Sequence, residues 1–153
     1  MIVYRLVRKD RTSLDGEGAA LFPGRWNPVN VPCLYTSATP SLAQLEVMVN
    51  VDDWQLFIKV PHFILHIQIP TNLVKEIAVS DLPSDWNTAA HSPSTQKFGA
   101  TLLTDPGILA FSVPSALSPL ERNIIINPGS TSFHKILIKK RTPFVFDTRL
   151  MRG

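Results

Sequence analysis

Residues 24–50 constrain the fold of this chain more than any other stretch, because they bring an arginine, a short apolar strand and a glutamate-bearing helix close together. Residues 31–36 (VPCLYT) are typical of a short strand. Thr39 and Pro40 predict the start of a helix that ends near Val49, because Thr is a preferred N-cap and Pro suits the first helical position. We therefore expect the rest of the chain to form a shell around this segment.

A glutamate lies among the apolar residues of the predicted helix. Leu42, Leu45 and Val49 recur at spacings of three and four, and Glu46 falls on the same face. A carboxylate there must be paired, neutral or beside a cavity. Two interpretations are open: a buried ion pair with an arginine, or a carboxylate kept for chemistry. Both need an arginine nearby, and we predict that Arg25, whose planar fork suits phosphate or carboxylate, meets Glu46 in one pocket.

A second arginine lies in an apolar segment near the start of the chain. Residues 2–7 (IVYRLV) are typical of a strand buried on both faces, and Arg5 is the charged residue within it. A buried arginine is costly unless an anion pairs with it. Either a salt bridge to an internal carboxylate or an anion bound in a cleft would meet this need. The polar, glycine-containing residues 8–24 are expected to form a rim loop.

Two further residues have both a structural and a functional interpretation. Tyr35 is either a core aromatic or a ring that stacks on a base or on nicotinamide. Ser115 follows an expected strand at residues 108–113, where polar groups can face a ligand, but turn capping is the favoured interpretation. Because no GxSxG motif surrounds Ser115, we do not expect a nucleophilic serine.

The remaining segments predict a mixture of helices and strands. Ser92 is the expected N-cap of a helix at residues 93–103, in which Gly99 is unfavourable. Residues 54–69 are expected to form one or two strands broken at Pro61. Further strands or buried runs are expected at residues 74–79, 124–126, 133–140 and 144–147.

Composition and motifs limit the class of protein. A chain of 153 residues, 44% hydrophobic and 18% charged, fits one folded domain over residues 1–153. Apolar runs fall short of the ~20 residues that cross a bilayer, and no signal peptide is evident, so a cytoplasmic protein without membrane contact is expected. A net charge of +3 without a nucleic-acid motif argues against direct nucleic-acid binding. His62 and His66 are not spaced to share one metal in a strand, so no metal is expected.

Taken together, the motifs of the chain resemble those of the RES domain family, which is named for an arginine, a glutamate and a serine. The resemblance covers almost the whole chain. The matching segments are YR near the start, GRWN at 24–27, LYTS at 34–37, SLAQLE at 41–46, VPSA at 113–116, ERNIIINP at 121–128 and FVFDTRL at 144–150.

The resemblance implies a fold, a function and a partner. The fold is an α+β fold similar to that of ADP-ribosyltransferases, with a split central β-sheet flanked by helices. The function is that of a toxin of a type II toxin–antitoxin system that takes NAD+ as substrate and depletes it by hydrolysis or phosphorolysis. The partner is an Xre-type helix-turn-helix antitoxin that covers the active site.

The resemblance also implies the site residues. Catalytic roles fall to Arg25, Glu46 and Ser115. The positions expected to bind NAD+ are Arg5, Arg25, Tyr35 and Ser115, with Asn123 and Asn127 as weaker members. Two other functions stay open: a mono-ADP-ribosyltransferase with a protein acceptor, and a non-catalytic module in which Glu46 and the arginines form a structural network.

Overall fold

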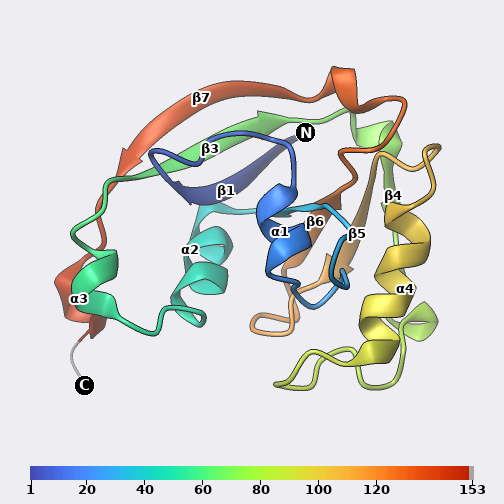
Figure 1. Ribbon diagram of the computed structural model, residues 1–153, viewed down its shortest axis with the longest axis horizontal. Helices are drawn as coiled ribbons and strands as arrows, with labels where there is room; N and C mark the ends of the chain where they lie inside the picture. The colour runs from blue at the N-terminus through green and yellow to red at the C-terminus, as the bar shows by residue number, and fades with distance from the viewer. Residues whose placement is uncertain (152–153) are drawn as a thin grey trace.

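Seven strands form one mixed sheet in the computed structural model, which describes residues 1–151 (Figure 1). The strand order is β4-β5-β6-β2-β1-β3-β7, and neighbours are antiparallel except for the parallel pair of β4 and β5. The strands are β1 (Ile2–Arg8), β2 (Leu34–Ser37), β3 (His62–Gln68), β4 (Val74–Glu76), β5 (Ala110–Pro114), β6 (Arg122–Ile126) and β7 (Leu137–Phe144). The α-helices are α1 (Glu17–Leu21), α2 (Pro40–Met48), α3 (Trp54–Phe57) and α4 (Pro93–Leu103).

The sheet is split between β1 and β2. Strand β1 pairs with β3 along its whole length, but it pairs with β2 at one position, where Tyr4 lies opposite Ser37. The sheet therefore consists of two halves, β4-β5-β6-β2 and β1-β3-β7, joined at this narrow contact (Figure 1). The predicted α+β fold with a split central sheet is confirmed.

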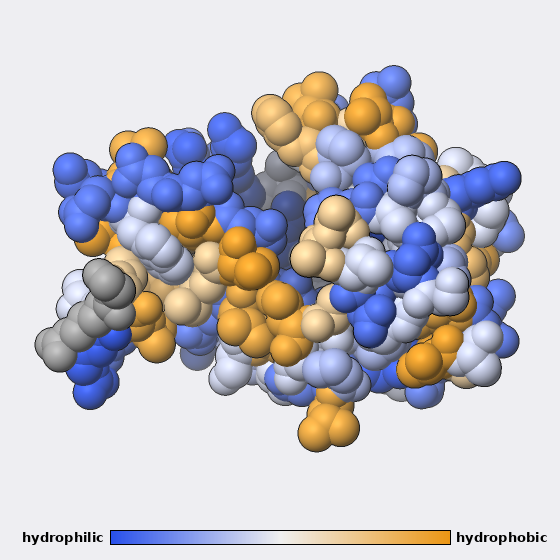
Figure 2. Space-filling view, turned by 90° about the horizontal axis from the view of Figure 1, so that it is seen from below, coloured by the Kyte–Doolittle hydropathy of each residue, from blue (hydrophilic) through white to orange (hydrophobic). Residues whose placement is uncertain are grey.

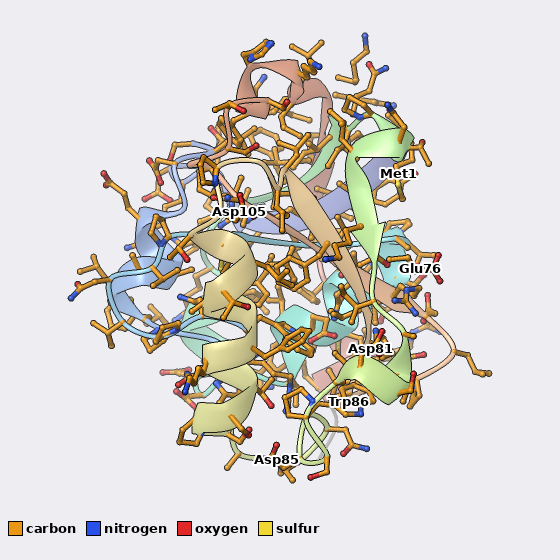
Figure 3. All side chains as sticks on the ribbon, turned by 90° about the vertical axis from the view of Figure 1, so that its right-hand side faces the viewer. Met1, Glu76, Asp81, Asp85, Trp86 and Asp105 are labelled. Atoms are coloured by element: carbon orange, nitrogen blue, oxygen red, sulfur yellow. The ribbon has the colours of Figure 1, made fainter. Side chains whose placement is uncertain are left out.

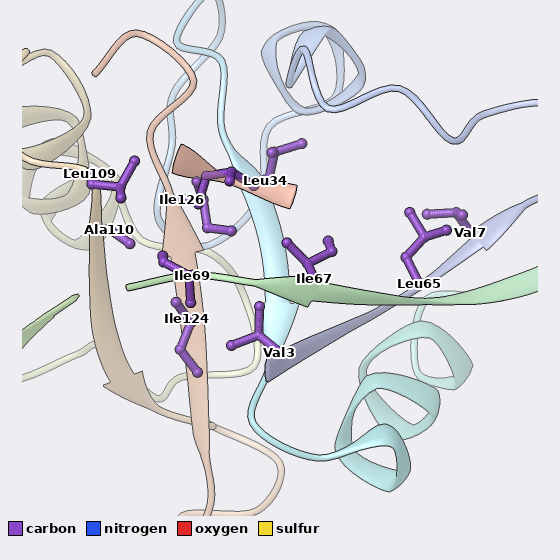
Figure 4. Packing of buried hydrophobic residues seen from close by; sticks show 11 residues of the cluster. Val3, Val7, Leu34, Leu65, Ile67, Ile69, Leu109, Ala110, Ile124 and Ile126 are labelled. Carbon is purple, nitrogen blue, oxygen red and sulfur yellow. The ribbon is translucent and has the colours of Figure 1, made fainter. Parts of the chain in front are cut away.

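Buried apolar side chains hold the two halves together. The largest cluster spans the split and combines Val3 and Leu65 of one half with Leu34 and Ile126 of the other (Figure 4). A second cluster, around Trp26, fills the space between α4 and the strands β5 and β6, and Figure 3 shows α4 running alongside this end of the sheet. Because each such side chain contributes about 1.5–3 kcal/mol when buried, these clusters fix the frame around the split.

Both long helices begin where the sequence predicts. The hydroxyl of Thr39 accepts a hydrogen bond from Leu42 N (3.1 Å) and caps α2, while Ser92 Oγ accepts from Thr95 N (3.2 Å) and caps α4. Each cap satisfies a backbone N–H that has no partner within the helix. Among residues 1–151, the structure contains no helix of the length and hydropathy that a membrane span requires.

The predicted apolar face of α2 is wrong at two positions. Leu42 is 1% exposed, but Leu45 and Val49 are 40% and 59% exposed. The other buried side chain of the helix is Ala43, which lines a cavity together with Glu46. The inner face of α2 thus borders an open space, which explains how it accommodates a glutamate.

Several segments differ from the predicted elements. Residues 54–57 form α3 instead of a strand, because Asp53 Oδ1 accepts from Leu56 N (3.0 Å) and caps a helix that the apolar pattern conceals. The segment expected as a rim loop contains α1. Near the end of the chain, residues 133–135 form a 3₁₀ helix where a strand was expected. Strand β7 begins at Leu137 and ends at Phe144, so residues 144–147 are not a separate strand.

Gly99 lets α4 approach the turn at residues 24–27 closely. A Cβ atom at Gly99 would lie 1.9 Å from the carbonyl oxygen of Trp26, which is far inside a van der Waals contact. Gln96 of the same helix donates from Nε2 to the carbonyl of Gly24 (3.0 Å). The glycine that weakens α4 as a helix therefore sets its distance from the segment that carries Arg25.

Candidate active site

A cavity of about 890 Å³ lies at the split of the sheet. Its walls come from β1, β2, α2, residues 18–26 and the loop at residues 87–91. Seen from below, the molecule is hollowed between its left and right parts (Figure 2). Most of the predicted site residues line this cavity: Arg5, Arg25, Tyr35, Glu46 and Asn123.

Two neutral side chains hold the carboxylate of Glu46. Its Oε1 accepts from Ser115 Oγ (2.8 Å), at the end of β5, and from Asn123 Nδ2 (2.5 Å) on β6. The ion pairs found among residues 1–151 are Arg8–Asp10 and Arg149–Asp147, so the interpretation of Glu46 as half of a buried ion pair is wrong. Oε2 has no side-chain partner in the same part of the chain, which leaves it available to a ligand.

Ser115 contacts the carboxylate of Glu46 without lining the cavity. It is 0% exposed and does not line the cavity. Its Oγ donates to Glu46 and accepts from Leu117 N and Ser118 N (both 3.1 Å). The turn-cap interpretation of Ser115 is confirmed, and the same hydroxyl fixes one oxygen of Glu46.

Asn123 continues this network to β2. Its Nδ2 donates to Glu46 while its Oδ1 accepts from Ser37 Oγ (2.8 Å). Ser37 and Asn123 are paired in register on β2 and β6. Ser37 was not among the predicted site residues, although its place in LYTS was a signal that it belongs to the site.

Arg25 reaches from the turn at residues 24–27 to the loop before α4. Its Nη1 donates to the carbonyls of Trp86 (2.7 Å) and Thr88 (2.8 Å). Asn87 and His91 of this loop line the cavity. Burial lowers the pKa of His91, and the charge of Arg25 lowers it further. Arg25 thus holds the loop at residues 86–88 through Nη1. Its Nε and Nη2 donors are left for a ligand.

Arg5 projects from β1 at the split. Its Nη1 is buried without a hydrogen-bond partner in residues 1–151. Burial lowers the pKa of this guanidinium, and the nearby Cys33 and Asp15 oppose the shift. Because no carboxylate lies within ion-pair distance of it in the described chain, the salt-bridge interpretation of Arg5 is wrong. The side chain of Arg5 lines the cavity, and its buried Nη1 is left without a partner there.

Tyr35 forms part of the cavity wall next to Gly24, in the turn that carries Arg25. Its hydroxyl donates to Asn27 Oδ1 (2.7 Å) and accepts from Trp26 N (2.9 Å). Burial raises its pKa well above the ordinary value. A Cβ at Gly24 would lie 2.6 Å from the hydroxyl, so Tyr35 packs tightly against the turn. Tyr35 lines the cavity, whereas its hydroxyl is hydrogen-bonded to Trp26 and Asn27 of the GRWN segment.

Asn127, the last weak candidate, lies outside the cavity lining. Its Nδ2 donates to the carbonyls of Asp105 and Ile108 (both 3.0 Å), and its Oδ1 accepts from Gly129 N (2.9 Å). These bonds make it a structural residue of the turn after β6. Within residues 1–151, His, Cys, Asp and Glu side chains do not gather in groups of three that could hold a metal ion.

The sequence model of the RES domain family matches residues 2–147. This chain belongs to the RES domain family. The resemblance inferred from its motifs is therefore confirmed, and the match covers every residue of the cavity lining named above.

Relatives are similar to this RES protein over nearly their full length. Toxin Res of Photorhabdus laumondii is 37% identical over 100% of this chain and 99% of the relative. Toxin Res of Yersinia enterocolitica is 30% identical over 98% of this chain and 99% of the relative. The Prs ADP-ribosylating toxin of Sphingobium sp. is 28% identical over 97% of this chain and 96% of the relative.

A solved structure has the same fold. A chain of the M. tuberculosis MbcT–MbcA toxin–antitoxin complex superposes with a TM-score of 0.76, covering 94% of the RES protein and 84% of that chain. At 16% sequence identity, this likeness concerns the fold alone.

Proposed function

We propose that this RES protein is the toxin of a type II toxin–antitoxin system and that it cleaves the nicotinamide–ribose bond of NAD+, which depletes NAD+ and arrests growth. It is an enzyme that consumes NAD+, and both the family and the ADP-ribosylating relative support this class. The observation that carries the proposal is the cavity at the split sheet, where two arginines and Glu46 converge without pairing with each other.

The two arginines suit the pyrophosphate of NAD+. Arg5 brings a buried donor without a partner, and Arg25 has donors that its backbone contacts do not use. Guanidinium–phosphate hydrogen bonds are charge-assisted and are stronger than those between neutral groups. Neutralising the pyrophosphate would also offset the cost of burying Arg5.

The carboxylate of Glu46 suits the cleavage of the nicotinamide–ribose bond. When the ribose C1′–nitrogen bond breaks, nicotinamide leaves as a neutral molecule with the bonding electron pair, and positive charge develops on the ribose, as in glycoside cleavage. A carboxylate beside the ribose stabilises that charge and orients the incoming acceptor. Ser115 and Asn123 fix Oε1, so Oε2 is the oxygen proposed to face the ribose.

The proposed acceptor of the ADP-ribosyl group is water or inorganic phosphate. Attack by water forms a C1′–oxygen bond and releases one proton, which Glu46 passes to solvent, giving ADP-ribose. Attack by phosphate forms the bond from the same C1′ to a phosphate oxygen and gives the phosphate ester of ADP-ribose. Transfer to a protein is a second candidate function, favoured by the relative that is named for ADP-ribosylation.

Product analysis tests the proposal. Purified protein incubated with NAD+ is expected to release nicotinamide, and the presence or absence of phosphate decides between ADP-ribose and its phosphate ester. Glu46→Gln, which keeps the shape of the side chain, should lower the rate by about a hundredfold or more. Arg25→Ala and Glu46→Ala should both abolish growth inhibition while the protein stays folded.

A matched control uses Glu76→Gln on β4, which is exposed and lies outside the cavity lining. It should leave nicotinamide release and toxicity unchanged. A soluble, folded Glu46→Gln protein with undiminished turnover would contradict the proposal.

The proposed partner is an Xre-type helix-turn-helix antitoxin that covers the cavity. The structural neighbour comes from a toxin–antitoxin complex, which supports an antitoxin of some type for this fold. Apolar side chains exposed close to the cavity fit a protein partner: Phe22 is 79% exposed, Leu117 40% and Val49 59%, and all three line it.

A further inference from the structure

A turn connects β5 to β6 and carries Ser115, the residue that donates to Oε1 of Glu46. Backbone hydrogen bonds cross-link this turn: Ser115 N donates to the carbonyl of Glu121 (3.0 Å), and Glu121 N donates to the carbonyl of Ser118 (2.8 Å). Two further backbone N–H groups of the turn donate to Ser115 Oγ. The turn at residues 115–121 is therefore a well-connected support for the carboxylate of Glu46.

The side chain of Glu121 connects this turn to the N-terminus of α2. Its Oε1 accepts from Thr39 Oγ1 (2.6 Å), and its Oε2 accepts from Ser118 Oγ (3.0 Å). Thr39 Oγ1 also accepts from a backbone N–H in the first turn of α2, which it caps. Within the described residues 1–151, Glu121 takes part in no ion pair. One carboxylate thus joins the cap of α2 to the turn that supports Glu46.

The charge of Glu121 suits its place beside α2. The first turn of this helix has no acidic residue of its own. The N-terminus of an α-helix carries partial positive charge, which a nearby carboxylate stabilises. Glu121 supplies that carboxylate from a position 82 residues away from Thr39 in the sequence. Because Glu121 does not line the cavity, it reaches a ligand there only through other residues.

We infer that Glu121 is a positioning residue, which sets the place of Glu46 by attaching α2 to the turn at residues 115–121 at a second point. This inference rests on the proposed cleavage of NAD+. The two attachments are at Thr39 and at Glu46, and both end on the same turn. Seven positions separate them, so they lie on nearly the same face of the helix, about two turns apart. Together they fix both the height and the rotation of α2 against the turn.

Loss of the attachment at Thr39 should lower the rate of cleavage more than the affinity for NAD+. Glu46 acts on charge that develops as the C1′–nitrogen bond breaks, whereas the arginines hold the pyrophosphate before and during that step. A small displacement of the carboxylate therefore weakens an interaction of the transition state selectively. We expect Glu121→Ala to lower kcat for nicotinamide release about tenfold or more and to change KM less than about twofold.

A conservative variant and a matched control accompany Glu121→Ala. Glu121→Gln keeps an oxygen that accepts from Thr39 and gains an amide that donates to Ser118 Oγ, so its kcat should lie within about threefold of the wild type. Asp53→Ala also removes a carboxylate that supports the N-terminus of a helix, but that helix is α3, and Asp53 lies outside the cavity lining. This control should lower the melting temperature and leave kcat unchanged.

A double-mutant cycle shows whether Glu121 acts through Glu46. In the Glu46→Gln background, Glu121→Ala should lower kcat less than about twofold, because the carboxylate that Glu121 positions is already absent. A further tenfold loss in that background would mean that Glu121 acts independently of Glu46, and it would overturn the inference. An equal loss of kcat in Asp53→Ala would also overturn it, because general destabilisation would then explain the effect.

Crystal structures of the wild-type and Glu121→Ala proteins separate this inference from the proposed function. The carboxylate of Glu46 is expected to move by about 0.5 Å or more relative to Ser115 in the variant. An unmoved carboxylate overturns the positioning role, whatever the wild-type protein does to NAD+. A displaced carboxylate in a protein whose wild type releases no nicotinamide supports the positioning role and overturns the proposed function alone.

Discussion

Arg5 Nη1 and His62 Nε2 are the two buried side-chain polar atoms without a hydrogen-bond partner in residues 1–151. Arg5 lines the cavity at the split of the sheet, whereas His62 packs against Phe57. A buried polar atom left unpaired costs about 1–3 kcal/mol, and more when it is charged. Of these two unpaired groups, Arg5 belongs to the cavity where we propose that NAD+ binds.

Replacing Arg5 should separate stability from function. Arg5→Met removes a buried charge and keeps a long side chain, so the free energy of unfolding should rise by about 1 kcal/mol. The affinity for NAD+ should fall about tenfold or more, because a charged hydrogen bond to phosphate is lost. Chemical denaturation measures the first quantity, and calorimetric titration of NAD+ into the Glu46→Gln background measures the second. A variant that lost stability and kept its affinity would show that Arg5 is structural.

At the scale of elements, the sequence was informative where a local hydrogen bond decides the structure. Thr39 and Ser92 predicted the first residues of α2 and α4, because an N-cap is a local contact. The same reasoning missed α3, whose cap Asp53 precedes residues that also suit a strand. It also misjudged which side of α2 is buried, since periodicity alone does not tell a core from a cavity.

Gly99 shows how tertiary contact overrides helix propensity. Alanine would favour α4 by about 1 kcal/mol as an isolated helix. In the folded chain its Cβ would strike the carbonyl of Trp26, so we expect Gly99→Ala to lower the free energy of unfolding by about 2 kcal/mol. Because the turn that carries Arg25 would shift, the rate of NAD+ cleavage should fall too.

A matched glycine provides the control. A Cβ at Gly18, in α1, would meet nothing within 4 Å, so Gly18→Ala should leave the melting temperature unchanged or raise it slightly. Thermal unfolding of the two variants side by side measures the difference. Equal melting temperatures would show that α4 can move away from the turn at no cost.

At the scale of the whole molecule, the site is made by convergence across the split sheet. Arg5 comes from β1 in one half, Asn123 from β6 in the other, and Glu46 from the helix that follows β2. The sequence predicted these residues through the family motifs, and LYTS pointed to Ser37, but no motif indicated that hydrogen bonds join Ser37 to Asn123 and Asn123 to Glu46. Such contacts join residues more than 70 positions apart, so pattern reasoning along the chain cannot find them.

This arrangement predicts that NAD+ stabilises both halves of the sheet together. In the Glu46→Gln protein, which should bind NAD+ without consuming it, NAD+ at about a hundred times its dissociation constant should raise the melting temperature by about 5 °C or more. Amide hydrogen exchange should slow in both β1 and β2, because the bound dinucleotide would span the contact of Tyr4 with Ser37. Protection confined to one half would mean that NAD+ does not lie across the split, and the assignment of Arg5 and Glu46 to one ligand would then be wrong.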